Sequence, residues 1–469
     1  MAQVCDTNRQ EERAALMLES PIPGLIFKLA YPTMISFVVT ALYNLVDAYF
    51  VSSLGTAATG AVGVNFALDQ VILMAGSFLA MGANSYIARL LGAGKTEKAS
   101  QVLSTSLLSA FFTGSFVMVT GLVFLEPMVR LMGSPPSVVP YAMDYASYML
   151  YAAPYMAANF VLNQCLRSEG SSLFSLMGML AGAVLNTALD PLFIFVFGWG
   201  ISGAAAATAI SKLVTFLILI TPYIRRKTLV APALRKVRFT WDIISEVCRM
   251  GAPALFRMGL SVAATVLLNN LAGQYSDSAL AAISVVSKVS MLINGIVMGY
   301  GQGFQPVVGF NWGAGRYDRV REAYRVASVS GICIISVLAL IAGIFAPQII
   351  SIFTDADAEM IALGSLSLRS QCLVTPSLAW GVVVNMLFAG AGKARGSFLM
   401  SVSRQGIFLL PMLLVLPPLL GVQGVMLVQA GADLGTLLMI IFFHHQINRE
   451  LNDRILLAQS DAGKAGKPC

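Results

Sequence analysis

Long apolar segments alternate with short polar connections along the whole chain. Each apolar segment is about 20 residues long or longer, which is the length that a helix needs to cross a bilayer. The short alternating segments of a membrane barrel do not occur. The pattern therefore predicts an all-α integral membrane protein. We expect twelve transmembrane helices, over residues 24–46, 57–86, 100–124, 137–164, 171–197, 201–222, 245–268, 279–307, 321–345, 358–388, 397–417 and 421–443.

Charged residues lie mostly in the connections between these segments. Of 469 residues, 57% are hydrophobic and 11% are charged, and the net charge of +7 comes mainly from alternate connections, above all the basic segment 225–238. The connection 354–359, on the opposite side, is acidic. Because Lys and Arg favour the cytoplasmic side, we expect a multi-pass protein of the cell (plasma) membrane with both termini in the cytoplasm. This origin of the basic charge requires no nucleic-acid partner.

The basic segment separates two halves that resemble each other. "LAYPTM" (29–34) aligns with "MGAPAL" (250–255), and "LLGAGKTEKA" (90–99) aligns with "NWGAGRYDRV" (311–320), in both cases 221 residues further along. Six spans separate equivalent positions, so both halves enter the membrane from the same side, as a parallel repeat with a pseudo-two-fold axis. We expect a cytoplasmic N-terminal segment (1–23), an N-terminal six-helix lobe (24–222), a basic cytoplasmic linker (223–244), a C-terminal six-helix lobe (245–443) and a cytoplasmic C-terminal tail (444–469).

Two carboxylates stand within predicted spans of the first half. Asp190 follows Asn186 by four residues, so the two side chains share one helix face. Pro191 comes next, and because proline lacks an N–H it interrupts the helical hydrogen bonds and predicts a bend. Asp47 and Thr208 reach a similar depth, in the outer half of the membrane. An aspartate inside a membrane normally faces a cavity or a partner rather than lipid.

These side chains form a set of oxygen ligands, and such a set suits a hard cation. Two neighbouring carboxylates also favour proton uptake by one of them. The equivalents of Asp47 and Asp190 in the second half are Leu268 and Leu410. Because the second half has the same pattern of spans without either acid, we interpret both acids as functional rather than structural.

Other charged residues also lie within predicted spans. Lys212 and Asp69 have comparable depth and can pair, and Arg404 and Asp433 can do so in the second half; buried pairs of this kind are more often structural. Three further cations have no obvious acidic partner: Arg257, Lys288 and Arg369. Their side chains either snorkel to the membrane surface, pair with unassigned groups, or line a cavity. If they line a cavity, they favour anionic groups on a substrate.

Four segments together resemble the multidrug and toxic compound extrusion (MATE) family. They are "KLAYPTMISFVVTALYNLVDAYFVSSLG" (28–55), "LLGAGK" (90–95), "NTALDP" (186–191) and "GISGAAAAT" (200–208). No single motif is decisive, but their order and the register of the two halves are specific, and the resemblance covers nearly the whole chain. It implies a twelve-helix, two-lobed antiporter that expels amphipathic, often cationic compounds against inward Na⁺ or H⁺.

The resemblance also implies roles for individual residues. In the prokaryotic branch with a cation site in the amino-terminal lobe, the matching coupling positions are Asp47, Asn186, Asp190 and Thr208. Tyr145 and Asn163 match positions that line the cavity of that lobe, and Pro32 matches the proline at which the first helix bends. The acids that other branches carry in the carboxyl-terminal lobe have no evident equivalent, since Arg257 and Arg369 occupy those spans.

Alternative functions remain open at this point. The chain could be a lipid-linked oligosaccharide flippase of the same superfamily, although only twelve spans are found, or a non-transport membrane protein. No Ser–His–Asp set, metal-ligand cluster or phosphate-binding loop favours an enzyme. We therefore expect a transporter of small molecules that functions in the lipid bilayer as a monomer, with no cofactor and no structural metal, and with Na⁺ or H⁺ as the coupling ion.

Overall fold

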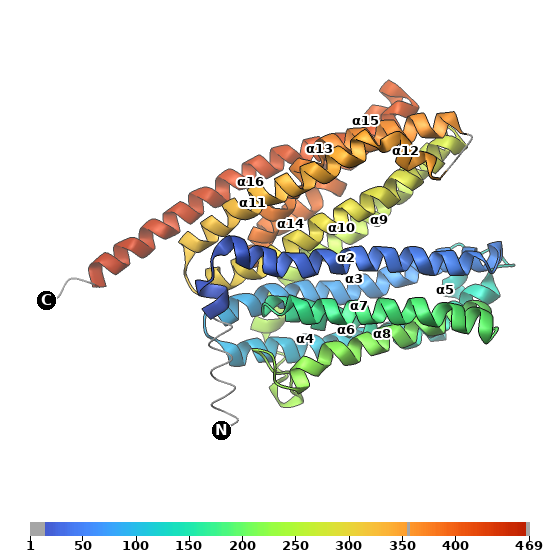
Figure 1. The fold of residues 1–469 in the computed structure, drawn as a ribbon. Helices are drawn as coiled ribbons and strands as arrows, with labels where there is room; N and C mark the ends of the chain where they lie inside the picture. The colour runs from blue at the N-terminus through green and yellow to red at the C-terminus, as the bar shows by residue number, and fades with distance from the viewer. Residues whose placement is uncertain (1–14, 354–356, 466–469) are drawn as a thin grey trace. The chain divides into compact units, whose positions relative to one another are not determined.

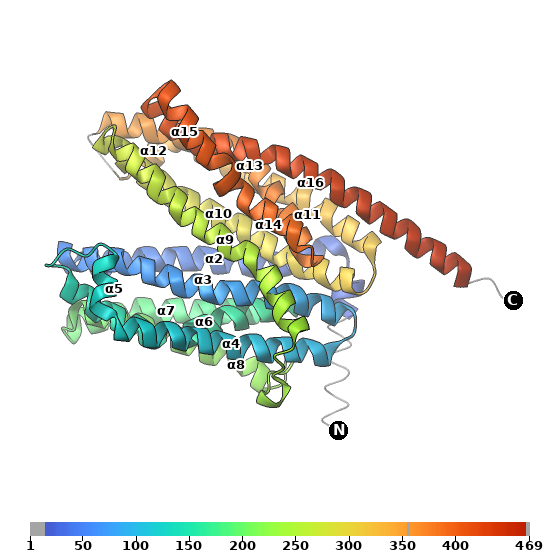
Figure 2. The ribbon, with the colours of Figure 1, turned by 180° about the vertical axis from the view of Figure 1, so that it is seen from behind.

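The computed structural model describes residues 15–353 and 357–465, and within these ranges it contains helices and no β-strand. Figures 1 and 2 show long helices running side by side within each half of the chain. The prediction of an all-α membrane protein is confirmed. Residues 1–14, residues 354–356 of the predicted external connection and residues 466–469 lie outside the described ranges.

From Ile22 onward, the first half forms six long helical segments and three short ones. α6 contacts α3, α4 and α8, and α7 contacts α8. The elements are α2 (Ile22–Ser52), α3 (Thr56–Gly92), α4 (Thr96–Val123), α5 (Leu125–Leu131), α6 (Val139–Ser168), α7 (Ser172–Pro191), the π-helix η1 (Leu192–Val196), α8 (Gly200–Ile224) and the 3₁₀-helix η2 (Leu234–Lys236).

The second half repeats this order. Its elements are α9 (Trp241–Gly273), α10 (Asp277–Gly313), α11 (Tyr317–Ile344), α12 (Ala346–Ser351), α13 (Ala358–Gly390), α14 (Ala394–Val402), the π-helix η3 (Ser403–Phe408), α15 (Leu409–Leu420) and α16 (Val422–Ala465). Asp357 caps α13, because its carboxylate accepts hydrogen bonds from the Ser278 hydroxyl (2.6 Å) and the Met360 amide (2.9 Å). These two bonds hold the pKa of Asp357 below its ordinary value.

Eleven helical segments of the described residues are long and apolar enough to cross a membrane. The one remaining predicted span, the fourth (137–164), forms α6, a helix of 30 residues that does not reach this level of hydropathy. Since α6 lies against three neighbouring helices and many of its residues are buried, little of its surface needs to match lipid. This burial explains why α6 carries polar residues such as Asn159 and Arg167 along its length.

Two spans are not regular α-helices. Immediately after Pro191 the chain forms the π-helix η1, which agrees with a proline that cannot donate its helical hydrogen bond. The eleventh span is likewise divided, with η3 between α14 and α15. α16 is longer than predicted, because it continues as one helix of 44 residues to Ala465. The predicted C-terminal tail is therefore helical over 444–465.

The chain divides into two compact units whose boundaries fall inside helices. Of the described residues, the first unit contains 15–16 and 31–255, and the second contains 17–30, 256–353 and 357–465. One boundary lies within α2, directly before Tyr31 and Pro32, and the other lies within α9, two residues after Pro253. Pro32 and Pro253 are equivalent in the repeat, so both first helices are divided between the units at corresponding places.

The repeat extends to backbone conformation. Gly94 and Gly315, which are 221 residues apart, have φ values of +71° and +72°. This left-handed conformation favours glycine, because it places no Cβ against the backbone. Each glycine forms the turn between the second and third helices of its half, so the matched "GAG" sequences have a common structural cause.

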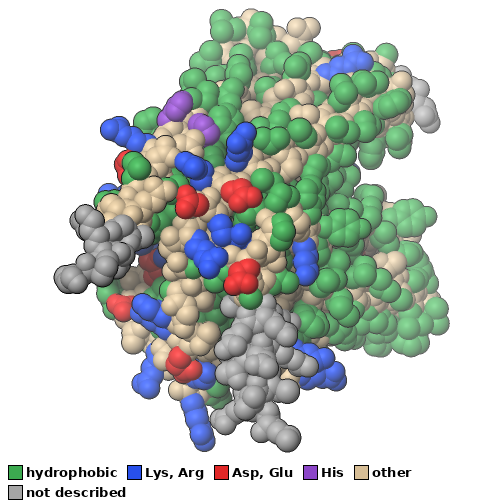
Figure 3. All heavy atoms as spheres, turned by 60° about the vertical axis from the view of Figure 1, so that its left-hand side comes forward, with side chains coloured by type: hydrophobic (Ala, Val, Ile, Leu, Met, Phe, Trp, Pro, Cys, Tyr) green, Lys and Arg blue, Asp and Glu red, His purple; other side chains and the backbone are tan. Residues whose placement is uncertain are grey.

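Charged side chains gather at one end of the helices. Figure 3 shows Lys, Arg, Asp, Glu and His side chains grouped on that face, with hydrophobic side chains beside them. Ion pairs join these groups within each unit, for example Arg89 with Glu246 and Lys393 with Glu450. All four residues lie next to connections predicted to be cytoplasmic. Burial, and to a lesser extent the nearby Arg454, lowers the pKa of Lys393 to about 8.

The predicted orientation can be tested with two matched cysteine variants. Leu131 and Leu234 are 90% and 82% exposed, and both lie in connections between predicted spans, where we expect a reagent in water to reach them. In a background without native cysteines, we expect a membrane-impermeant maleimide added outside cells to label Leu131→Cys at once. Leu234→Cys should be labelled only after permeabilisation. Labelling of Leu234→Cys in intact cells would reverse the assigned orientation.

Candidate functional site

Three of the predicted coupling residues meet between α7 and α8. The Asn186 amide nitrogen donates to the carboxylate oxygen Oδ1 of Asp190 at 3.1 Å and to the hydroxyl oxygen of Thr208 at 3.2 Å. Asn186 and Asp190 are one helical turn apart on α7, and Thr208 is on α8. All three side chains are buried. The four-residue spacing in the sequence therefore does place the amide beside the carboxylate.

Asp47 brings a second carboxylate from α2. It is 9% exposed and interacts electrostatically with Asp190. Three buried oxygens of this group have no hydrogen-bond partner: Oδ1 of Asp47, Oδ1 of Asn186 and Oδ2 of Asp190. A buried acceptor without a donor is costly, so the arrangement favours uptake of a proton or of a small hard cation.

The site does not resemble a transition-metal centre. Among the described residues, no three His, Cys, Asp or Glu side chains are close enough together to hold a metal ion. The local chemistry is that of carboxylate, amide and hydroxyl oxygens, which suits Na⁺ or H⁺.

The two residues predicted to line the cavity of the amino-terminal lobe differ in their surroundings. Tyr145 is buried on α6. Asn163 instead accepts a hydrogen bond from the Ser175 hydroxyl at 3.0 Å. The second half has the same arrangement, in which Asn385 accepts from Ser397 at 2.7 Å. A bond present in both halves indicates a structural role that links consecutive helices.

The structure does not bring the three unpaired cations of the second half together. Arg257 is partly exposed, and the one charged group found to act on it is the like-charged Arg404. Lys288 is exposed. Arg369 donates from Nε to the carbonyl of Gly343 at 3.2 Å, near the end of α11, and lines a surface groove of about 630 Å³. Arg369 therefore caps a helix end, where a cation is favourable.

One neighbour of the site was missed in the sequence. Tyr43 lies one turn before Asp47 on α2, and its ring faces the Lys212 ammonium, with 4.8 Å between the nitrogen and the ring centroid. The four-residue spacing between Tyr43 and Asp47 was the available signal, because it places both on one face of the helix.

Comparison with known proteins identifies the family. The sequence profile of the MatE family matches residues 32–192 and 253–414, one segment in each half. The chain belongs to the MATE family. It is therefore a multi-pass membrane transporter and not an enzyme, and the two matched segments correspond to the internal repeat recognised in the sequence.

Individual MATE relatives agree with this assignment. The multidrug export protein MepA of Staphylococcus saprophyticus is 28% identical over 399 residues, which cover 84% of this chain and 87% of MepA. An outward-facing multidrug resistance MATE transporter of the MOP superfamily is 26% identical, with a TM-score of 0.88, over 94% of this chain and 99% of that one.

A third relative is a MOP superfamily transporter from Pyrococcus furiosus, described as having a binding pocket of reversed polarity that suggests a different function. It is 26% identical with a TM-score of 0.87, over 94% of this chain and 98% of that one.

Proposed function

We propose that this chain is a secondary active efflux antiporter. It exports amphipathic drugs or metabolites in exchange for Na⁺ or H⁺, and its substrate cavity opens alternately to the two sides of the membrane. In this proposal it functions as a monomer in the cell membrane with both termini in the cytoplasm, and it needs no cofactor beyond the coupling ion.

One kind of observation supports export and another supports ion coupling. The relatives named MepA are multidrug export proteins, and one structural relative is a multidrug resistance transporter. The observation that carries ion coupling is the Asn186–Asp190–Thr208 network, which leaves a buried carboxylate oxygen of Asp190 without a hydrogen-bond partner. A bound cation stabilises a buried carboxylate whose oxygen has no hydrogen-bond partner, and such intramembrane acids mark ion pathways.

Coupling requires that the cation favour one conformation over the other. Asp47 is on α2, whereas Asn186, Asp190 and Thr208 are on α7 and α8. A cation bound by both groups draws the part of α2 after Tyr31 toward α7. Pro32 weakens α2 at the start of that part, because it lacks the N–H for one helical hydrogen bond. Release of the cation removes this attraction and lets α2 return.

Transport by purified protein in lipid vesicles tests the proposal. A panel of amphipathic cations, zwitterions and anions is loaded, and a Na⁺ gradient or a pH gradient is imposed separately. We expect uphill movement of at least one compound with one of the two gradients, and none in protein-free vesicles or after an ionophore collapses that gradient. Movement that responds to neither gradient would rule out antiport with Na⁺ or H⁺.

A further inference from the structure

The surroundings of the coupling site contain more negative than positive charge. Within the first unit, Asp47, Asp69 and Asp190 are carboxylates in the membrane, and each has a buried oxygen without a hydrogen-bond partner. The ammonium of Lys212, on α8, interacts electrostatically with Asp69 and Asp47. Two of these carboxylates, Asp69 and Asp47, therefore share this lysine, and the coupling function assigned above does not use it.

Lys212 is not fixed to either carboxylate. The described residues contain no ion pair between Lys212 and Asp69 or Asp47, so the pairing with Asp69 that the sequence suggested is not formed. Its ammonium lies over the Tyr43 ring at 4.8 Å from the centroid, which is a cation–π contact. The backbone at this point is fixed, because the Asn159 amide donates to the Lys212 carbonyl at 2.9 Å. Any movement of the ammonium is therefore a movement of the side chain alone.

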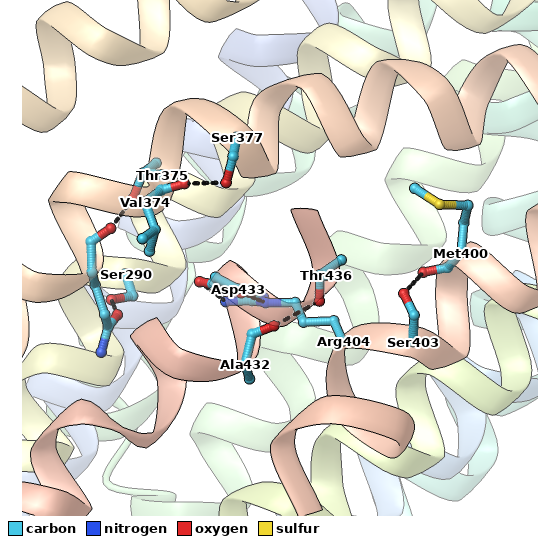
Figure 4. Close-up of polar contacts among 11 residues, drawn as sticks. Ser290, Val374, Thr375, Ser377, Met400, Ser403, Arg404, Ala432, Asp433 and Thr436 are labelled. Carbon is cyan, nitrogen blue, oxygen red and sulfur yellow. Dashed lines mark hydrogen bonds and ion pairs between the residues drawn. The ribbon is translucent and has the colours of Figure 1, made fainter. Parts of the chain in front are cut away.

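The internal repeat provides a comparison. Gly200 aligns with Gly421, so Lys212 aligns with Asp433, and Asp69 aligns with Ser290. Asp433 forms a closed ion pair: Arg404 donates from Nε to one carboxylate oxygen and from Nη2 to the other, the latter at 3.2 Å. Figure 4 shows this guanidinium against Asp433. At this repeat position, Asp433 of the second unit is held in an ion pair, whereas Lys212 of the first unit forms none among the described residues.

We propose that Lys212 is a tethered counter-cation of the coupling site, which shifts between Asp69 and Asp47 as the coupling ion binds and leaves. With the ion bound at Asp47 and Asp190, the ammonium is drawn to Asp69. When the ion leaves, the ammonium moves toward Asp47 and compensates its charge. Lys212 thus competes with the incoming ion and promotes its release. This inference rests on the proposed function, since it takes Asp47 and Asp190 as the ion site.

Two substitutions should change cation affinity in opposite directions. Lys212→Met removes the competing charge, so we expect affinity for the coupling cation to rise by about tenfold or more, the size expected for a charge several ångströms away in a partly buried site. Asp69→Asn removes one of the two carboxylates that attract Lys212. The ammonium should then stay near Asp47 and compete with the ion, so affinity for the coupling cation should fall. Binding of radiolabelled Na⁺ to purified protein measures the affinity for Na⁺. The decrease of this binding as the pH is lowered measures the competition by protons.

The double variant distinguishes a mobile ammonium from a fixed charge. Fixed charges act independently, so the two changes would add in the logarithm of the affinity. If Lys212 moves, Asp69→Asn should have a much smaller effect in the Lys212→Met protein than in the wild type, because no tethered cation remains to be released. Additive effects, or an unchanged affinity in Lys212→Met, would overturn the proposal.

Two controls separate this test from folding and from the proposed function. Asp433→Asn opens the closed pair of the second unit, so it should lower thermal stability but leave cation affinity unchanged. Asp190→Asn should abolish saturable cation binding. If Asp190→Asn binds the cation normally, the coupling site itself is wrong and this inference fails with it. If only the Lys212 variants behave as wild type, the coupling site stands and Lys212 is a structural residue.

Discussion

Replacement of Asp190 with Asn is expected to abolish cation-coupled export while the protein still folds in the membrane. The change preserves the size of the side chain and the hydrogen-bonding position beside Asn186, but it removes the charge that attracts the ion. Removal of a membrane-buried charge also relieves an insertion cost of about 3 kcal/mol, so the amount of folded protein should not fall. Gradient-driven export in vesicles and the yield of monodisperse protein are the two measurements.

Asp144 provides a matched control for this variant. It is an aspartate of the same lobe, on α6, and it is exposed. Asp144→Asn removes the same charge away from the site, and export should remain at the wild-type rate. Normal export by Asp190→Asn would exclude Asp190 from coupling, whatever the behaviour of the control.

Cation binding to purified protein shows whether Asp47 and Asp190 act together. If both close one site, Asp47→Asn alone should cost nearly as much cation affinity as the double variant, because either change already disables the site. Independent losses that add in the double variant would instead indicate two separate ion sites.

Local spacing in the sequence predicted the parts of the site that lie on one helix or in one repeat. Asn186 and Asp190 face each other because residues four apart share a helix face, and the hydrogen bond between them is present. The replacement of both acids by leucine in the second half is the basis for interpreting them as functional, and this interpretation stays a prediction. These conclusions need only helical geometry and the alignment of the two halves.

Contacts between helices were less predictable, because depth in the membrane does not determine rotation about the helix axis. Lys212 and Asp69 have similar depth, yet Lys212 faces Tyr43 and no ion pair forms between them. The hydrogen bond between Asn163 and Ser175 likewise joins two helices and had no signal in the sequence. The length of α16 was underestimated because its polar continuation carries no apolar signal, although local helical bonds are sufficient to extend it.

Close helix crossings were also invisible in the sequence pattern, although they impose the strictest constraints on single residues. Within the first unit, α3 meets the beginning of α9 with their backbones almost in contact. A Cβ placed on Gly82 would lie 2.1 Å from the Val247 carbonyl oxygen, and one on Gly251 would lie 2.1 Å from the Phe78 carbonyl oxygen. The second unit has an equivalent approach, where a Cβ on Gly303 would lie 2.3 Å from the Cα of Ala30.

We therefore expect Gly82→Ala to destabilise the protein severely, although it adds a single methyl group. The clash is with backbone, which cannot rotate away, so the two helices must separate or the substitution must be accommodated by strain of about 3 kcal/mol or more. Small residues permit such close contacts between membrane helices, and their packing replaces the hydrophobic effect that lipid does not supply. A fall in the thermal unfolding midpoint and in the yield of monodisperse protein would show the effect.

Gly63→Ala is the matched control, because Gly63 is on the same helix and a Cβ there would have no atom within 4 Å. This variant should be neutral or slightly more stable, by about 0.5–1 kcal/mol, since alanine favours a helix over glycine. A Gly82→Ala protein as stable as Gly63→Ala would mean that α3 and α9 do not approach this closely. The division of α9 between the two units would then need another explanation, since this crossing is what holds its beginning to the first unit.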